Sequence, residues 1–136
     1  GLYNPHSSRF FLRNSNTTGP HDVTFVYGQA DWTPLAGDWD GDGVDTVGLF
    51  NPSSGRFFLR NANSKGPSAI TFTFGQRGWR PLVGDWNADG KDTVGVYNPK
   101  TGRYFLRNQN ESGPADLVFQ HGLPDASPLG GVWKLP

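Results

Sequence analysis

Residues 34–50 read Pro34-Leu-Ala-Gly-Asp-Trp-Asp-Gly-Asp-Gly-Val-Asp-Thr-Val-Gly-Leu-Phe50. This stretch places three carboxylates at alternate positions, Asp38, Asp40 and Asp42, and adds Asp45 just before an apolar, β-branched run. Carboxylates about 4 Å apart repel each other by roughly 4 kcal/mol at an effective dielectric constant of about 20, and a hard cation reverses that repulsion. The intervening glycines let the backbone turn sharply enough for the side chains to converge. The spacing therefore predicts a cation-binding loop between two strands.

Calcium is the predicted ion, because it takes about six to eight oxygen ligands and the chain has no Cys and no His cluster for a softer metal. We expect the Val44 carbonyl to be a main-chain ligand and Asp45 to be the closing carboxylate. The alternative is an Asp/Gly-rich turn whose aspartates cap their own backbone. Four acids in the eight residues 38–45 favour the metal. The loop is not an EF-hand, because no helical pattern flanks it.

The chain repeats itself with a period of 47 residues. The segment Arg-Phe-Phe-Leu-Arg-Asn begins at Arg9 and Arg56, and returns as Arg-Tyr-Phe-Leu-Arg-Asn at Arg103. We therefore expect a single repeat domain over residues 1–136, and its repeats are residues 1–47, 48–94 and 95–136.

The cation loop returns once, with one acid fewer. The predicted ligand positions of this second loop are Asp85, Asn87, Asp89, Lys91 and Asp92. Because Asn87 replaces an acid and Lys91 adds a positive charge, we expect weaker calcium binding here than in the first loop. The third repeat has Val132 in place of the first acid but keeps Trp133, so the role of this tryptophan does not depend on an ion.

Each repeat is expected to form four short strands. In the first complete unit they are predicted over residues 34–39, 46–51, 56–61 and 70–75, which are rich in Val, Phe, Thr and Leu. Gly, Pro, Ser and Asn separate these runs, and no segment has helical periodicity. Four-stranded units with a period of about 40 to 50 residues are typical of β-propeller blades. The predicted fold is therefore all-β, built from propeller blades.

Residues 37–50 resemble the FG-GAP or VCBS-type repeat of integrin α-subunit propellers and many secreted bacterial proteins. The resemblance extends over the whole chain through the repeat. It implies a propeller in which calcium is held by the loop between the two innermost strands of a blade. In that family the last acid stands at loop position nine, whereas Asp45 and Asp92 stand at position eight.

The composition argues against several classes of binding partner. The formal net charge is zero and the signs are mixed, which argues against nucleic acid or an anionic membrane surface. No apolar run approaches the roughly 18 residues of a membrane span. The chain has no Met, even at position 1, so we expect that it was excised from a longer product. Weak calcium sites fill most readily outside the cytosol, which favours an extracellular or cell-surface location.

The histidines and acids do not predict catalysis. His6, His21 and His121 stand at three different phases of the repeat. The sequence has no nucleophile elbow, phosphate loop or zinc-protease motif. The acids follow calcium spacing and do not form a separated acid and base pair. We therefore expect a non-catalytic protein.

A ligand site is predicted next to the innermost strands. Gln29 with Trp32, and Gln76 with Trp79, place an aromatic ring beside polar groups in the loops that join blades. Such a surface suits a glycan or protein ligand. The alternative, which we favour, is that Trp32 and Trp79 pack adjacent blades together.

Arginine followed by asparagine ends the third strand of each unit, at Arg13, Arg60 and Arg107. We expect these arginines, and the asparagines of the loops that follow, to hydrogen-bond the loop backbone. A recognition surface is the alternative.

The sequence thus predicts a non-catalytic, calcium-stabilised propeller module for adhesion or for glycan or protein recognition. The alternative is a structural assembly unit, or the C-terminal appendage of a secreted enzyme. Residues 1–47 contain strands two to four of a blade, and residues 127–133 look like a spare innermost strand. We expect two copies to exchange this strand and form a six-bladed homodimer, with a filament as second choice. Loss of upstream blades is a third possibility.

Overall fold

The computed structural model describes residues 1–130. Over this range the chain is all-β, with eleven strands and no helix. The strands are β1 (Leu2–Asn4), β2 (Arg9–Leu12), β3 (Val23–Val26), β4 (Thr33–Gly37), β5 (Thr46–Asn51), β6 (Arg56–Leu59), β7 (Ile70–Thr73), β8 (Arg80–Gly84), β9 (Thr93–Asn98), β10 (Arg103–Leu106) and β11 (Leu117–Gln120). No helix in this range is long and apolar enough to cross a bilayer.

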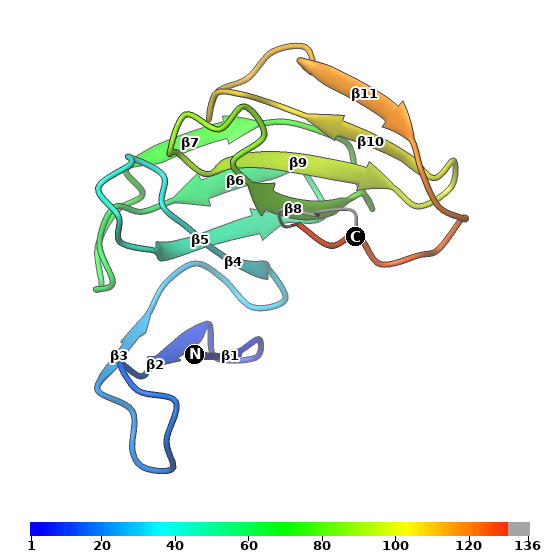
Figure 1. The fold of residues 1–136 in the computed structure, drawn as a ribbon. Helices are drawn as coiled ribbons and strands as arrows, with labels where there is room; N and C mark the ends of the chain where they lie inside the picture. Colours follow the sequence, from blue (N-terminus) through cyan, green and yellow to red (C-terminus); the bar gives the residue numbers. More distant parts are fainter. Residues whose placement is uncertain (131–136) are drawn as a thin grey trace.

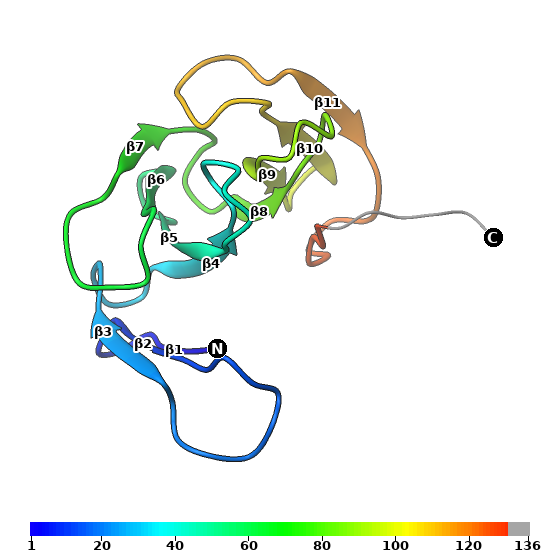
Figure 2. The same ribbon diagram turned by 60° about the vertical axis from the view of Figure 1, so that its left-hand side comes forward.

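The strands form three antiparallel sheets, in which each strand pairs with the next along the chain. The first sheet has the order β1-β2-β3, the second β4-β5-β6-β7 and the third β8-β9-β10-β11. Figures 1 and 2 show the second sheet between the other two. The four-stranded units predicted from the repeat are confirmed for the second and third sheets.

The pairing register repeats with the sequence. Pro34 of β4 is opposite Leu49 of β5, and Pro81 of β8 is opposite Val96 of β9. The first sheet differs, because β1 pairs only with β2 among residues 1–130. By this register, the strand that would pair with the free edge of β1 corresponds to β4 and β8 in the other two sheets.

The strand predicted over residues 127–133 is not formed where the structure describes it. Residues 127–130 have no strand assignment, because a strand needs a hydrogen-bonding partner and none of the described strands pairs with them. Residues 131–133, which include Trp133, lie outside the described residues.

Aromatic side chains fill the space between successive sheets. Phe10 and Phe25 of the first sheet pack with Val47 and Leu49 of β5. One repeat later, in chain order, the matching cluster holds Phe57, Phe72, Val94 and Val96. Burying each large apolar side chain contributes about 1.5 to 3 kcal/mol. The same inter-sheet interface is thus built twice.

The tight turn between β5 and β6 depends on a glycine. Gly55 has φ of 72°, in the left-handed region, and its N–H donates to the Asn51 carbonyl at 2.9 Å. A Cβ on Gly55 would lie 3.1 Å from the carbonyl oxygen of Gly75. Both the backbone angle and the close approach of the next loop therefore require glycine.

A buried arginine holds the long loop after the third strand. The Arg60 guanidinium donates to the Pro67 carbonyl and, through Nε, to the Ala62 carbonyl at 3.2 Å. Arg13 and Arg107 reach the equivalent proline carbonyls, Pro20 and Pro114. The predicted contacts between these arginines and the loop backbone are therefore confirmed.

Candidate metal centre

The first acidic loop wraps around one carboxylate. Asp38 Oδ1 accepts the N–H groups of Gly41 at 2.8 Å and Asp42 at 3.1 Å, and Oδ2 accepts that of Gly43 at 2.8 Å. Gly41 and Gly43 have φ of 79° and 85°, which bring these N–H groups inward. The Asp42 carboxylate in turn accepts the Val44 N–H at 2.8 Å. The alternation of acids and glycines therefore produces a closed loop.

Three of the four predicted acids of this loop converge. One carboxylate oxygen from each of Asp38, Asp40 and Asp42 lies within 4.8 Å of the others. Partial desolvation raises the pKa of Asp38, but the N–H groups of Gly43, Gly41 and Asp42 outweigh it, so the pKa lies below the ordinary value. Asp38 is thus held as an anion next to two exposed carboxylates.

The remaining predicted ligands of the first loop lie at its end. Val44 is exposed, and Asp45 lies outside the three-acid cluster. The main-chain carbonyl of Asp45 accepts the Nδ2–H of Asn63 at 3.0 Å, which fixes the end of the loop to the second sheet. The loop therefore combines the capping predicted as the alternative with the convergence of acids that calcium needs.

The second acidic loop differs in that a side-chain amide donates to one of its carboxylates. Asp85 accepts the N–H groups of Asp89 and Gly90 at 3.1 and 2.9 Å. The Asn87 amide donates to Asp89 Oδ2 at 2.9 Å, and together with the Lys91 N–H this bond lowers the pKa of Asp89. Because the amide already neutralises part of the repulsion, this loop has less need of a cation.

Lys91 lies between the two loops. A Cβ on Gly41 of the first loop would lie 3.0 Å from Lys91 Cγ. The positive charge predicted to weaken the second loop is therefore also placed beside the first one.

Asp92 joins two sheets. Its Oδ2 accepts the main-chain N–H of Asp38 at 3.0 Å, and its own N–H donates to the Asp38 carbonyl at 2.8 Å. The predicted closing acid of the second loop thus contacts the backbone of the first.

A polar pocket between the second and third sheets was not predicted. It has a volume of about 530 Å³. Its lining residues are Trp39, Ile70, Asn87, Asp89, Lys91, Thr93, Asn108, Gln109 and Asn110. Trp39 is only 4% exposed, and among residues 1–130 neither its Nε1–H nor the buried Asn110 Oδ1 has a hydrogen-bond partner. The equivalent atoms one repeat away, Trp86 Nε1 and Asn63 Oδ1, are orphaned in the same way, so these costly buried groups recur with the repeat.

The two tryptophans of the loops that join successive sheets stack on phenylalanines. Trp32 lies 4.4 Å from Phe58 and Trp79 lies 4.7 Å from Phe105, measured between ring centroids, with interplanar angles of 19° and 23°. Each stacked pair lies within one sheet and the loop that precedes it, but Trp32 and Trp79 also pack against the clusters that join successive sheets, which is the packing role expected as the alternative to a ligand platform. The side chains of Gln29 and Gln76 are exposed nearby, and a ligand at these four residues stays a prediction.

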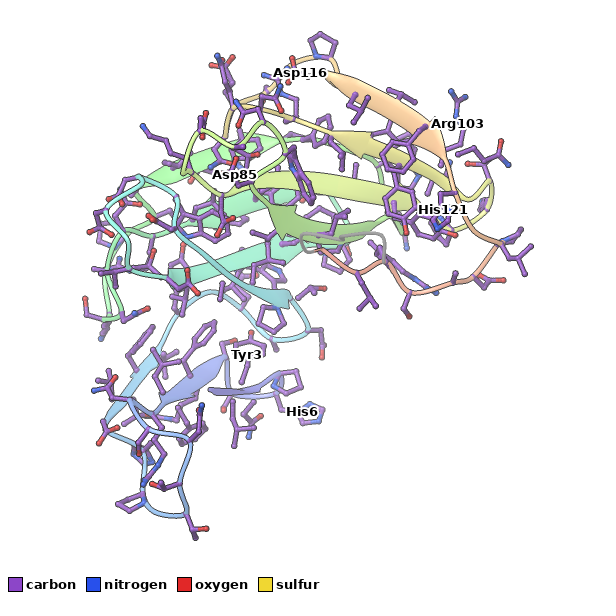
Figure 3. All side chains as sticks on the ribbon, viewed as in Figure 1. Tyr3, His6, Asp85, Arg103, Asp116 and His121 are labelled. Carbon is purple, nitrogen blue, oxygen red and sulfur yellow. The ribbon has the colours of Figure 1, made fainter. Side chains whose placement is uncertain are left out.

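The three histidines are not gathered into a site. Figure 3 shows His6 beside the first sheet and His121 beside the third. His21 stacks edge-on against Phe11 at 5.2 Å.

No family model, curated protein or solved structure matches the chain.

Proposed function

We propose that the chain is a non-catalytic, calcium-stabilised recognition module whose three sheets are blades of a β-propeller. The repeated packing between successive sheets supports the propeller. The single observation that carries recognition is the pocket whose wall combines residues of the second acidic loop with the side-chain amides of Asn108, Gln109 and Asn110.

Calcium fits the oxygen donors of the first loop. Asp38, Asp40 and Asp42 would hold it with the Val44 carbonyl, and the ion would neutralise a cluster of repelling charges. Because the Asp45 carboxylate lies outside this cluster, it would bind the ion only if its side chain moved. The second loop would bind calcium more weakly, because the Asn87 amide and Lys91 already compensate its acids.

The ligand class that suits the pocket is a saccharide. The pocket is lined by the side-chain amides of Asn108, Gln109 and Asn110 and by one charge of each sign, from Asp89 and Lys91. Sugar hydroxyl groups both donate and accept hydrogen bonds, so they suit this mixture of donors and acceptors. A calcium ion that orders the loops would order the wall of this pocket. A secreted or surface setting supplies both the ion and the glycan.

A glycan array probed with the labelled 136-residue chain tests this function. We expect a defined set of saccharides to bind in calcium and to be released in chelator. Asn110→Ala should reduce binding, whereas its matched control Asn63→Ala should not. Asn63 is a matched control because each asparagine donates a hydrogen bond of 3.0 Å to the main-chain carbonyl of an aspartate.

Three results would contradict the proposal. A folded, calcium-loaded chain could bind nothing on the array, or the two asparagine variants could lose binding equally. Binding that is abolished by Trp79→Ala but unaffected by Asn110→Ala would place the ligand at the tryptophan loops instead.

A further inference from the structure

The outer edge of β1 has no neighbouring strand among residues 1–130, whereas the equivalent edges of β5 and β9 are covered by β4 and β8. Leu2 is 75% exposed, whereas its counterparts in the next two repeats, Leu49 and Val96, are 0% exposed. An apolar groove of about 310 Å³ runs along this edge. Its lining residues are Gly1, Leu2, Tyr3, Phe10, Leu12, Pro34, Leu35, Ala36 and Val47.

The strands that cover the equivalent edges share a sequence. β4 covers β5 with Pro34-Leu-Ala-Gly37, and β8 covers β9 with Pro81-Leu-Val-Gly84. Residues 128–130 repeat this segment as Pro-Leu-Gly. In the register of the other two sheets, Pro128 would stand opposite Leu2 and Leu129 opposite Gly1.

Within one chain this segment lies at the other end of the molecule. The Arg80 guanidinium donates to the carbonyls of Asp125 and Ala126 at 2.8 and 2.6 Å, which holds the segment against the third sheet. Gly130 is in contact with the Val83 carbonyl of β8. Figures 1 and 2 both show residues 125–130 beside β8, with β1 beyond the second sheet.

The outer face of the third sheet and the segment that follows it are open in the same way. Leu129 is 71% exposed, whereas its counterpart Leu82 is 6% exposed. Phe119 of β11 is 38% exposed, and its counterparts Phe25 and Phe72 are each 6% exposed because the next sheet covers them. The third sheet thus presents the half of the inter-sheet interface that the first sheet lacks.

One polar contact of the repeated interface is also missing at the first sheet. Asp92 accepts a main-chain N–H from the loop after β4, across the interface between the second and third sheets. Its counterpart Asp45 is exposed, and its carboxylate has no hydrogen bond to another sheet among residues 1–130. The position that would donate to it is residue 132, which lies outside the described residues.

We infer that these two surfaces bind each other between two copies of the chain. The segment from residue 127 onward of one copy adds to the free edge of β1 in the other as an antiparallel strand. The outer face of the third sheet then packs on the first sheet of the partner. The contact is head-to-tail, so it closes into a ring if the rotation allows and otherwise extends into a filament. The second copy is the occupant because it carries the matching register and the apolar face.

Sedimentation of the 136-residue chain with two single variants tests the inference. We expect the wild type to associate reversibly, and Leu2→Asp and Leu129→Asp each to be monomeric, because each buries an unpaired charge in every homotypic contact. The matched control is Leu123→Asp, which changes a leucine that is 76% exposed but lies outside both surfaces. The control should associate like the wild type.

Mixing the two monomeric variants gives a sharper readout. Leu2→Asp keeps an intact tail segment and Leu129→Asp keeps an intact β1 edge, so the mixture should form a 1:1 complex although neither variant self-associates. Circular dichroism and a cooperative melt of each variant show that it remains folded. A wild type that stays monomeric, or two folded variants that associate like the control, would overturn the inference.

A disulfide checks the register, since the chain has no other Cys. The double variant Leu2→Cys, Pro128→Cys should form a covalent dimer or polymer under oxidation, because residues opposite each other in an antiparallel pair have the Cα separation that a disulfide needs. Leu2→Cys, Leu123→Cys is the control and should not cross-link efficiently. Equal cross-linking of both would overturn the proposed pairing.

Discussion

Asp92 Oδ2 accepts the main-chain N–H of Asp38 at 3.0 Å, and the Asp38 carbonyl accepts the Asp92 N–H at 2.8 Å. The two residues are 54 positions apart and belong to different sheets. This reciprocal pair joins the backbone of the first acidic loop to the end of the second. The three-acid cluster and the packing of the two sheets are therefore physically linked.

Replacing Asp92 should loosen that link. We expect Asp92→Ala to lower the free energy of unfolding by about 1.5 to 3 kcal/mol, the range for a hydrogen bond to a charged group. Urea denaturation in chelator, at low protein concentration, measures the change without a contribution from the ion or from association. The matched control is Asp45→Ala, which should change stability by less than about 0.5 kcal/mol under these conditions. Equal losses of unfolding free energy in the two variants would contradict the prediction that the Asp92 contact stabilises the fold.

Calcium should raise the melting temperature, because an ion that binds only the folded chain stabilises it by mass action. The gain is about 2.7 kcal/mol when the free ion is at 100 times its dissociation constant. Asp40→Asn removes one charge from the three-acid cluster and should weaken calcium binding strongly, whereas Asp89→Asn in the second loop should have a smaller effect. Calorimetric titration gives both affinities. A melting curve that is unchanged by excess chelator would contradict this prediction.

Acid should destabilise the calcium-free chain through Asp38. Its pKa is lower in the folded state than in the unfolded chain, so the folded state binds its proton less readily. The contribution of Asp38 is fully present above the unfolded-state pKa, about 3.9, and is lost as pH falls through the lower folded-state value. Denaturation in chelator between about pH 2 and pH 6 measures this loss. Asp38→Asn should flatten the curve, and an unaltered acid limb in that variant would argue against the assignment.

Arg60 and Arg107 should each contribute more to the stability of the fold than Arg13. Both are buried, whereas Arg13 is partly exposed. Arg60→Ala leaves the Pro67 and Ala62 carbonyls without their donor and removes the packing of a long side chain, so we expect a loss of about 3 kcal/mol in the free energy of unfolding. Thermal denaturation compared with Arg13→Ala provides the measurement. A loss for Arg13→Ala as large as that for Arg60→Ala would contradict the ranking.

Local patterns in the sequence were enough to predict the all-β class, the repeat and the positions of the strands within it, but not that residues 127–130 would form no strand. The predicted strand over residues 46–51 matches β5 (Thr46–Asn51), and the strand predicted over 56–61 begins where β6 (Arg56–Leu59) begins. These features depend on the alternation of side chains and on turn residues such as Gly55, which act over a few positions. The convergence of Asp38, Asp40 and Asp42 was predictable for the same reason, since one loop contains all three.

Contacts between sheets were decided by the tertiary structure. The contact of Asp92 with Asp38 joins loops of two sheets, and the polar pocket is lined by Trp39 and Ile70 of the second unit together with residues of the third. The repeat places chemically similar residues in every unit, but it does not say which face of one unit meets the next. That choice depends on the twist and spacing of whole sheets, and these are set by the packing of many side chains at once.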